Sequence, residues 1–381
     1  MARKRVEKNL AFDDQKKCYY AYFDYGVGDD GRRIRSTQCF QDKEAAQQAL
    51  RCFALQRPQR QTQMLGGTTV GEWLRYWLED IVRPNRESTT YYCYHCIIKN
   101  HLIPALGAIP LHRLLPYQIQ HYYLQMMEER GLSANTVYKH HILLHTALKA
   151  AYRQSILPEN PVDRVEPPRL QQPRRLYYDS HQLKALFQAV EGRSLELPVK
   201  LAGYLGLRRG EICGLRWENV DLQRGLIWVR RVRTTAGEQI VEKQPKTTHS
   251  VRQLAIGGLE ELMTLLRAEQ LRQQAEQVRL GEAWRGEGYV VVQRGGAPTN
   301  PNQLTAEFGA FVREKGLPPI TIHGLRHTFA SVANSAKVPL LEIGKALGHK
   351  DITITGRIYT HIFDQTHQSV LNTVAAQIMA G

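Results

Sequence analysis

One stretch of the chain, residues 158–173, is so dense in proline that it constrains everything folding on either side of it. The segment reads PENPVDRVEPPRLQQP, and proline both removes a backbone donor and clashes with the preceding helical turn. We therefore expect an extended linker over residues 161–178. The length of 381 residues fits two or three domains, which we place at residues 1–65, 66–160 and 179–381.

The charge balance indicates a polyanionic partner. The formal net charge is +15 and the pI is about 9.6. The basic excess is +5 in residues 1–65, +2 in residues 66–160 and +8 in the remainder, so it is not confined to one tail. A basic surface spread over several domains favours nucleic acid bound along an extended path.

Several other classes of protein are disfavoured. No apolar run is long enough to span a bilayer, and the basic start lacks the apolar core of a secretory signal, so we expect a cytoplasmic protein. Its six scattered cysteines are then reduced thiols. Cys93 and Cys96 have a C-x-x-C spacing, but no second pair completes a zinc ligand set. We expect no metal and no cofactor.

The first 60 residues predict a small sheet braced by one helix. Residues 17–25 and 32–40 are rich in aromatic and β-branched side chains, with a Gly/Asp turn between them, which is typical of strands. Asp42 is a candidate N-cap for the helix. The apolar inner face of that helix comprises Ala45, Ala46, Ala49, Leu50 and Phe53.

Residues 66–160 predict four helices. The first begins at Val70 and should break at Pro84. The others fit residues 88–103, 116–130 and 133–155. The last has Ser133 as its N-cap and an apolar stripe made of Val137, His141, Leu144 and Leu148. On this helix, Lys139 and His140 are candidates to contact phosphates.

The last domain combines helices with short strands. Helices fit residues 180–190, 195–205, 259–277, 303–315 and 365–379. Strands fit residues 226–233, 239–243 and 251–254. The predicted fold class is therefore a multidomain protein, mainly α-helical with small β-sheets, ending in a mixed α+β domain.

The C-terminal domain also holds residues suited to phosphoryl transfer. Splitting a phosphodiester without a metal requires neutralised non-bridging oxygens, an activated nucleophile and a proton for the alkoxide leaving group. Arginine suits the first task because its planar fork stays charged and pairs bidentately with phosphate. The candidate residues are Arg208, His323, Arg326, His349 and Tyr359.

The sequence contains five motifs whose order resembles that of the tyrosine recombinases, the phage integrase family. G-x-R-x-x-E is matched by Gly206, Arg208 and Glu211, and this spacing selects Arg208 over the adjacent Arg209. The P-K-T context contains Lys246, and H-x-x-R contains His323 and Arg326. L-G-H ends at His349, and Tyr359 follows ten residues later.

The resemblance implies a role for each residue. Tyr359 would attack the phosphodiester to give a 3′-phosphotyrosine, and His323 would accept its proton. Lys246, with Lys243 as the alternative, would protonate the departing 5′ oxygen. Arg208, Arg326 and His349 would bind the phosphate, and Glu211 would orient Arg208. The reaction would need no nucleotide and no metal.

The resemblance also implies an architecture and partners. The N-terminal unit resembles a three-stranded arm-site-binding domain, with Arg32, Arg33 and Arg35 as base readers. Residues 66–160 resemble the core-binding domain, and Arg174 and Arg175 of the linker suit a phosphate path. The implied protein integrates and excises a phage or mobile element in a bacterial nucleoid, as a homo-tetramer on two duplexes. A host DNA-bending protein and an excisionase are possible partners. The alternatives are a relaxing topoisomerase of the type IB kind and a catalytically silent DNA-binding regulator.

Overall fold

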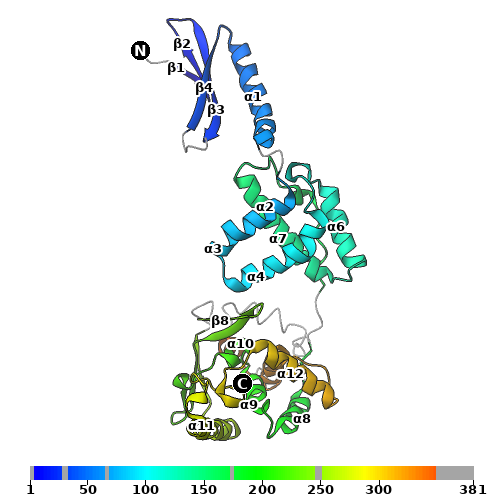
Figure 1. Cartoon of the computed structure of the whole chain (residues 1–381), viewed down its shortest axis with the longest axis vertical. Coiled ribbons are helices and arrows are strands. Elements are labelled where there is room, and N and C mark those ends of the chain that lie inside the picture. The colour runs from blue at the N-terminus through cyan, green and yellow to red at the C-terminus, as the bar shows by residue number, and fades with distance from the viewer. Residues whose placement is uncertain (1–3, 28–32, 65–67, 172–175, 245–250, 349–381) are drawn as a thin grey trace, which may run out of the picture. The chain divides into compact units, whose positions relative to one another are not determined.

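The chain consists mainly of helices with small antiparallel sheets, which confirms the predicted fold class (Figure 1). The computed structural model describes residues 4–27, 33–64, 68–171, 176–244 and 251–348. It divides into two compact units, Met1–Gln172 and Pro173–Gly381. Among the described residues, no helix has the length and apolar character needed to cross a membrane.

The N-terminal sheet has four strands, one more than the resemblance implied. The strands are antiparallel in the order β1 (Lys4–Glu7), β2 (Leu10–Asp13), β3 (Cys18–Val27) and β4 (Arg33–Phe40). The β1–β2 hairpin was not expected because its strands are only four residues long. Helix α1 (Lys43–Met64) begins after Asp42, which accepts a hydrogen bond from the Ala45 amide, and packs on the sheet through Ala46.

The rest of the first unit is a bundle of four helical stretches, as predicted. Each of the first two contains a π-helical turn. The first consists of α2 (Val70–Tyr76), η1 (Trp77–Val82) and α3 (Arg83–Asn85). The second consists of α4 (Ser88–Ile97), η2 (Ile98–Leu102) and α5 (Ile103–Leu106). The others are α6 (Pro116–Glu128) and α7 (Ala134–Arg153), with the 3₁₀ turn η3 (Leu111–Arg113) before α6.

Two expectations for this unit were wrong. The first helix does not break at Pro84, because the π turn of η1 places this proline in the first turn of α3, where its missing amide costs nothing. The predicted linker is also not extended throughout. Pro161–Arg164 forms the 3₁₀ helix η4, and Val162 is buried in the core of the helical bundle. Four residues of regular structure suffice to bury Val162 even in a proline-rich segment.

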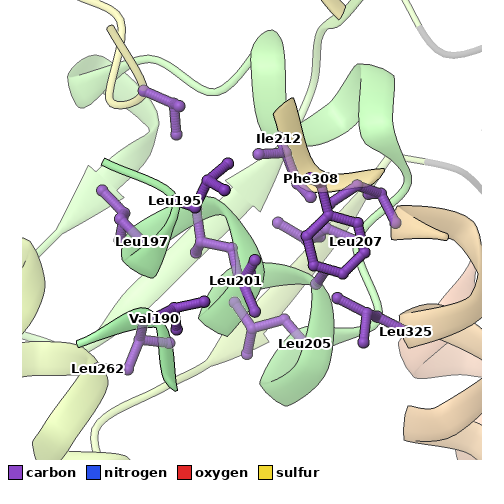
Figure 2. Packing of buried hydrophobic residues seen from close by; sticks show 14 of the residues in the cluster. Val190, Leu195, Leu197, Leu201, Leu205, Leu207, Ile212, Leu262, Phe308 and Leu325 are labelled. Atoms are coloured by element: carbon purple, nitrogen blue, oxygen red, sulfur yellow. The ribbon is translucent and has the colours of Figure 1, made fainter. Parts of the chain in front are cut away.

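The second unit is built around a helical core with two small sheets at its side. Its helices are α8 (Ser180–Val190), α9 (Glu196–Leu205), α10 (Arg209–Cys213), α11 (Glu260–Leu280), α12 (Pro301–Glu314), α13 (Ile322–Ser335) and α14 (Leu340–Leu347), with the 3₁₀ turns η5 (Trp217–Asn219), η7 (Gly281–Ala283) and η8 (Arg294–Gly296). Figure 2 shows side chains of α9, including Leu201 and Leu205, packed among Phe308 of α12 and Leu325 of α13. This core fixes the helices whose ends form the site described below.

The two sheets of this unit separate residues that the sequence suggested were one strand. One sheet contains β5 (Val220–Asp221), β6 (Leu226–Val229) and β9 (Arg252–Ala255), in that order. The other is the hairpin of β7 (Val232–Ala236) and β8 (Gln239–Lys243). The predicted strand over residues 226–233 therefore divides between β6 and β7, and the chain changes sheets at Arg230 and Arg231.

Candidate active site

Arg208 lies at a sharp junction between two helices. Helix α9 ends at Leu205, and its C-cap Gly206 has a left-handed φ of 60°, which suits glycine. A side chain there would also meet Leu347 and Phe329. Two residues later Arg208 is the N-cap of α10, with an extended backbone. Its side chain is 37% exposed, so the junction presents a guanidinium group partly to solvent.

Glu211 holds Arg208 in place from within the first turn of α10. One carboxylate oxygen accepts a hydrogen bond from the Arg208 amide at 2.9 Å, and the other accepts one from Arg208 Nη1 at 2.8 Å. The predicted pairing of these two residues is therefore present. Glu211 is itself buried, so its carboxylate holds the partly exposed Arg208 from the interior of the protein.

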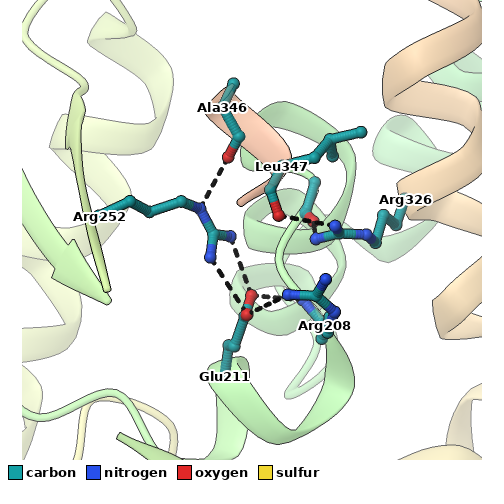
Figure 3. Close-up of polar contacts among 7 residues, drawn as sticks. Arg208, Glu211, Arg252, Arg326, Ala346 and Leu347 are labelled. Atoms are coloured by element: carbon teal, nitrogen blue, oxygen red, sulfur yellow. Dashed lines mark hydrogen bonds and ion pairs between the residues drawn. The ribbon is translucent and has the colours of Figure 1, made fainter. Parts of the chain in front are cut away.

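Arg252 also binds Glu211, and no sequence motif predicted it as part of this site. It lies on β9, and its Nη1 and Nη2 donate to the two oxygens of Glu211 at 3.1 Å and 2.9 Å (Figure 3). Its Nε donates to the Ala346 carbonyl, near the end of α14, at 2.7 Å. An arginine at the inward-facing position of a short strand is the signal that could have identified it, since a buried charge requires a partner.

Burial alone would raise the pKa of Glu211, but the hydrogen bonds and charge of Arg252, together with the charges of Arg208 and Arg326, lower it to about 2. Glu211 is therefore ionised at neutral pH. These three arginines surround one carboxylate, which leaves a local excess of positive charge in a partly buried place. Such an excess is suited to an anion whose charge increases in a transition state.

Arg326 joins the ends of two helices. It lies on α13 and is buried, with Nη1 donating to the Gly206 carbonyl at 2.8 Å and Nη2 donating to the Leu347 carbonyl at 2.6 Å. Figure 3 shows Arg252 and Arg326 approaching adjacent carbonyls, Ala346 and Leu347, at the end of α14. The predicted motifs around Arg208 and Arg326 are thus brought together through the end of α9.

Two histidines lie on the first turns of α13. Thr321 is the N-cap of this helix and accepts a hydrogen bond from the Gly324 amide at 2.9 Å. His323 is exposed and His327 is half-buried, with ring centroids 4.9 Å apart at a T-shaped angle of 83°. His323 is three residues before Arg326, so the helix carries an accessible imidazole beside the arginine network.

Three of the six predicted catalytic residues lie outside the described residues: Lys246, His349 and Tyr359. Two of them come shortly after a described element in the sequence. Helix α14 ends at Leu347, its C-cap Gly348 has a left-handed φ of 65°, and His349 is the next residue. Strand β8 ends at Lys243, three residues before Lys246. No group of three or more His, Cys, Asp or Glu side chains within the described ranges is arranged to hold a metal.

Among the predicted DNA contacts, His140 was wrong. It is buried on α7, and its Nδ1 is 2.8 Å from the Tyr122 hydroxyl. Burial, followed by the charge of His101, lowers the pKa of His140 to about 4, so this imidazole is neutral at pH 7. Lys139, its neighbour, is exposed. The helix turns by about 100° per residue, which places the two on different faces.

The remaining predicted contacts are not described at the level of side chains. Arg33 and Arg35 are on β4, where they pair with Val27 and Asp24 of β3, but their side chains lie outside the described structure. Arg32, Arg174 and Arg175 lie entirely outside it.

Comparison with protein families gives two matches. The phage integrase family matches residues 177–366, and the phage integrase N-terminal SAM-like domain matches residues 69–127. The first match contains the whole arginine network, and the second contains the first two helical stretches of the bundle and most of α6.

Curated relatives match most of the chain. A "Tyrosine recombinase XerC-like" protein of Caldanaerobacter subterraneus is 25% identical over 325 residues, covering 80% of this chain and 82% of the relative. An "Integrase" of Saccharopolyspora erythraea is also 25% identical, covering 91% of each chain.

Solved structures share the fold. The Tn1549 transposon integrase in complex with a circular intermediate DNA covers 81% of this chain and all of its own, with a TM-score of 0.67 at 19% identity. A lambda integrase tetramer bound to a Holliday junction covers 92% of this chain and 98% of its own, with a TM-score of 0.59 at 18% identity.

Proposed function

Because the chain belongs to the phage integrase family, the tyrosine recombinases, we propose that it cuts and rejoins DNA through a covalent link to Tyr359. The protein is a site-specific DNA recombinase, and integration of a mobile element or phage genome fits its relatives.

In the proposed reaction, the Tyr359 oxygen attacks the phosphorus and the bond from phosphorus to the 5′ oxygen breaks. The phenol proton passes to His323, and Lys246 supplies a proton to the departing 5′ oxygen. The product is a 3′-phosphotyrosine and a 5′-hydroxyl. Attack by a 5′-hydroxyl of the partner duplex then reverses the steps, so the phosphodiester energy is retained.

The observation that carries this proposal is the network of Arg208, Arg252 and Arg326 around the single carboxylate of Glu211. Arg208 is the partly exposed member and is suited to contact a non-bridging oxygen directly. Arg326 and His349 would complete the phosphate site. Because the groups are held on helix ends and a strand, little reorganisation is needed when charge develops.

A nicked suicide substrate tests the nucleophile. The nick lets a short 5′ fragment diffuse away after cleavage, so the wild-type protein should accumulate as a covalent complex on denaturing gels. Tyr359→Phe should give no complex, whereas Tyr152→Phe, at an exposed tyrosine of α7, should behave like wild type. A complex formed by Tyr359→Phe, or a DNA-linked peptide that lacks Tyr359, would refute the assignment.

The same assay separates the two alternatives. A relaxing topoisomerase would remove supercoils from plasmids lacking an attachment site, and a silent regulator would bind DNA without any covalent product. We expect cleavage only at a specific site.

We further propose that residues 1–65 bind arm-type sites, that residues 66–160 bind the core site, and that residues 179–381 perform catalysis after the linker. Arg32, Arg33, Arg35, Lys139, Arg174 and Arg175 would contact DNA in these parts. Deleting residues 1–63 should leave cleavage of a core site intact while weakening complete recombination. Unchanged recombination after this deletion would remove the arm-binding proposal.

The assembly we propose is a homo-tetramer on two duplexes. The lambda integrase structure bound to a Holliday junction is a tetramer, and this chain covers nearly all of that protein. A host DNA-bending protein and an excisionase would set the direction of recombination, and the protein would work on the bacterial nucleoid. Sedimentation of the protein on a synthetic four-way junction should give four copies per junction.

A further inference from the structure

Glu211, Arg208, Arg252 and Arg326 form the Glu211 network. A second polar cluster, which has no residue in common with it, surrounds the buried side chain of Tyr289. The Tyr289 hydroxyl donates to Glu242 of β8 and accepts from Arg216 Nη2 at 2.8 Å. Arg216 Nη2 also donates to Glu242 Oε2 at 3.2 Å. Arg233 of β7 donates through Nη1 to Glu242 Oε1 and to the Tyr289 hydroxyl, the latter at 3.3 Å.

The Tyr289 cluster, defined as Arg216, Arg233, Glu242 and Tyr289, is held by more than its hydrogen bonds. The guanidinium groups of Arg216 and Arg233 lie over the Tyr289 ring, 4.5 Å and 5.2 Å from its centroid. Burial would raise the pKa of Glu242, but the Tyr289 hydrogen bond and the Arg233 charge lower it. The carboxylate therefore stays charged and fixed between two cations.

The hairpin that contains Glu242 depends on such contacts because it is a separate two-stranded sheet, and an isolated hairpin is marginally stable. Strand β7 is held by α10, where glycines permit close approach. A Cβ at Gly210 would lie 3.0 Å from the Arg233 carbonyl oxygen, and one at Gly214 would lie 2.9 Å from the Arg233 amide. These contacts fix β7, with which β8 is paired along its length, and Glu242 connects β8 to Arg216 and Tyr289 outside the hairpin.

Glu242 is four residues before Lys246 in the chain. Four residues span at most about 14 Å between Cα atoms when fully extended, so a fixed Glu242 limits where the Lys246 backbone, and through it the ammonium group, can lie. A general acid must come within hydrogen-bond reach of the oxygen that it protonates. The position of β8 thus bears directly on how often the proposed acid is correctly placed.

We propose that the Tyr289 cluster is a positioning device for the general acid, acting through the end of β8 on Lys246. The inference rests on the proposed function of Lys246. In the affected step, the bond from phosphorus to the 5′ oxygen breaks, its electron pair moves to that oxygen, and the Lys246 proton is transferred to it. Arg216, Glu242 and Tyr289 do not touch the reacting atoms.

A sulfur leaving group tests this role. When sulfur replaces the bridging 5′ oxygen, the thiolate departs without a proton, so a variant impaired only in acid catalysis should recover. On the ordinary oxygen substrate, Glu242→Gln and Tyr289→Phe should slow single-turnover cleavage by about 10- to 100-fold, the loss expected from small misplacement of a catalytic group. On the sulfur substrate, both should cleave within about threefold of wild type.

The chain offers a matched control in a second Tyr–Glu–cation group. Tyr204 of α9 donates a hydrogen bond to Glu261 of α11, and Glu261 also forms an ion pair with Lys200 of α9. Glu261→Gln removes a similar charge from the same unit, and it should cleave both substrates at the wild-type rate. Thermal unfolding and DNA binding of each variant show that it is folded, and Tyr289→Phe removes only one hydroxyl.

The possible failures are distinguishable. If Lys246→Ala is slow on both substrates, Lys246 is not the general acid, and the positioning inference falls with that assignment. If sulfur rescues Lys246→Ala while Glu242→Gln and Tyr289→Phe are unimpaired on oxygen, or are slow on both substrates, the acid assignment stands and the inference is overturned. Rescue of Lys246→Ala, Glu242→Gln and Tyr289→Phe alike, with no effect of Glu261→Gln, supports it.

Discussion

Replacing Glu211 with glutamine should destabilise the second unit by about 3 kcal/mol at pH 7. The pKa of Glu211 falls from the ordinary 4.5 to about 2, and a depression of this size corresponds to about 3 kcal/mol of preference for the charged form. Mutational experience with buried ion pairs gives a similar range of about 3 to 5 kcal/mol when one partner is removed. Glutamine keeps the shape of the side chain but leaves Arg208 and Arg252 without a counter-charge.

Urea unfolding of the full chain, followed as a function of pH, measures this effect. The folded pKa of Glu211 lies below the unfolded value, so its stabilisation is fully present above about pH 4.5 and is lost as the pH falls toward 2. The unfolding free energy of Glu211→Gln should therefore fall less than that of the wild type over this pH range.

The control is Glu218→Gln. Its carboxylate is 59% exposed and lies 3.5 Å from Arg231, and the variant should lose less than about 1 kcal/mol. A Glu211→Gln protein as stable as wild type at pH 7, with the same acid dependence, would refute the reasoning.

Two further predictions concern other parts of the molecule. The pKa of His140 is about 4 when folded, below the 6.5 of an exposed histidine, so protonation favours the unfolded chain. The unfolding free energy of the first unit should therefore fall by up to about 3 kcal/mol as the pH falls from about 6.5 to 4. His140→Phe should flatten this slope in urea unfolding, and an unchanged slope would exclude His140 as its source. Gly214→Ala should cost about 1 to 3 kcal/mol in the same assay, because its methyl group would meet the backbone of β7 at 2.9 Å. Gly258→Ala, where nothing lies within 4 Å, should cost less than about 0.5 kcal/mol, and equal costs would contradict the close-approach argument.

Local signals in the sequence were sufficient where the contact itself is local. Arg208 and Glu211 are three residues apart at a helix start, where side chains at this spacing can meet, and the family resemblance implied this pair. Ser133, Asp179 and Thr321 each accept a hydrogen bond from the amide three residues on, as N-caps do. The caps and the amphipathic stripes explain why most helix starts were predicted within a few residues.

Two features were not predicted correctly from the sequence. The role of Arg252 depends on a partner far away in the chain, and the burial of His140 required a choice between two adjacent histidines. Arg252 meets Glu211 across 41 residues of sequence, and no local pattern records which carboxylate a buried arginine will find. His140 and His141 are adjacent histidines on one helix, and the choice between them was made by packing. The structure places His140 beside Tyr122 and leaves His141 half-buried against Tyr123.

The Glu211 network raises the question of why charges rather than apolar side chains fill this place. A buried ion pair is often no more stabilising than well-packed apolar residues of similar volume, so stability alone does not account for it. The network does set positions: it fixes Arg208 at the start of α10 and holds β9 to the carbonyl of Ala346 near the end of α14.

A positioning role for the Glu211 network predicts that stability and activity can be separated. The double variant Glu211→Leu, Arg252→Met removes both charges of the buried Glu211–Arg252 pair and leaves Arg326 on its two carbonyl partners. Its unfolding free energy should therefore lie within about 2 kcal/mol of wild type, much of the difference coming from the lost cap at the Arg208 amide. The same protein should form covalent complex on the suicide substrate at least about 100-fold more slowly, because Arg208 is no longer oriented. Cleavage at the wild-type rate by this double variant would mean that the network serves packing alone.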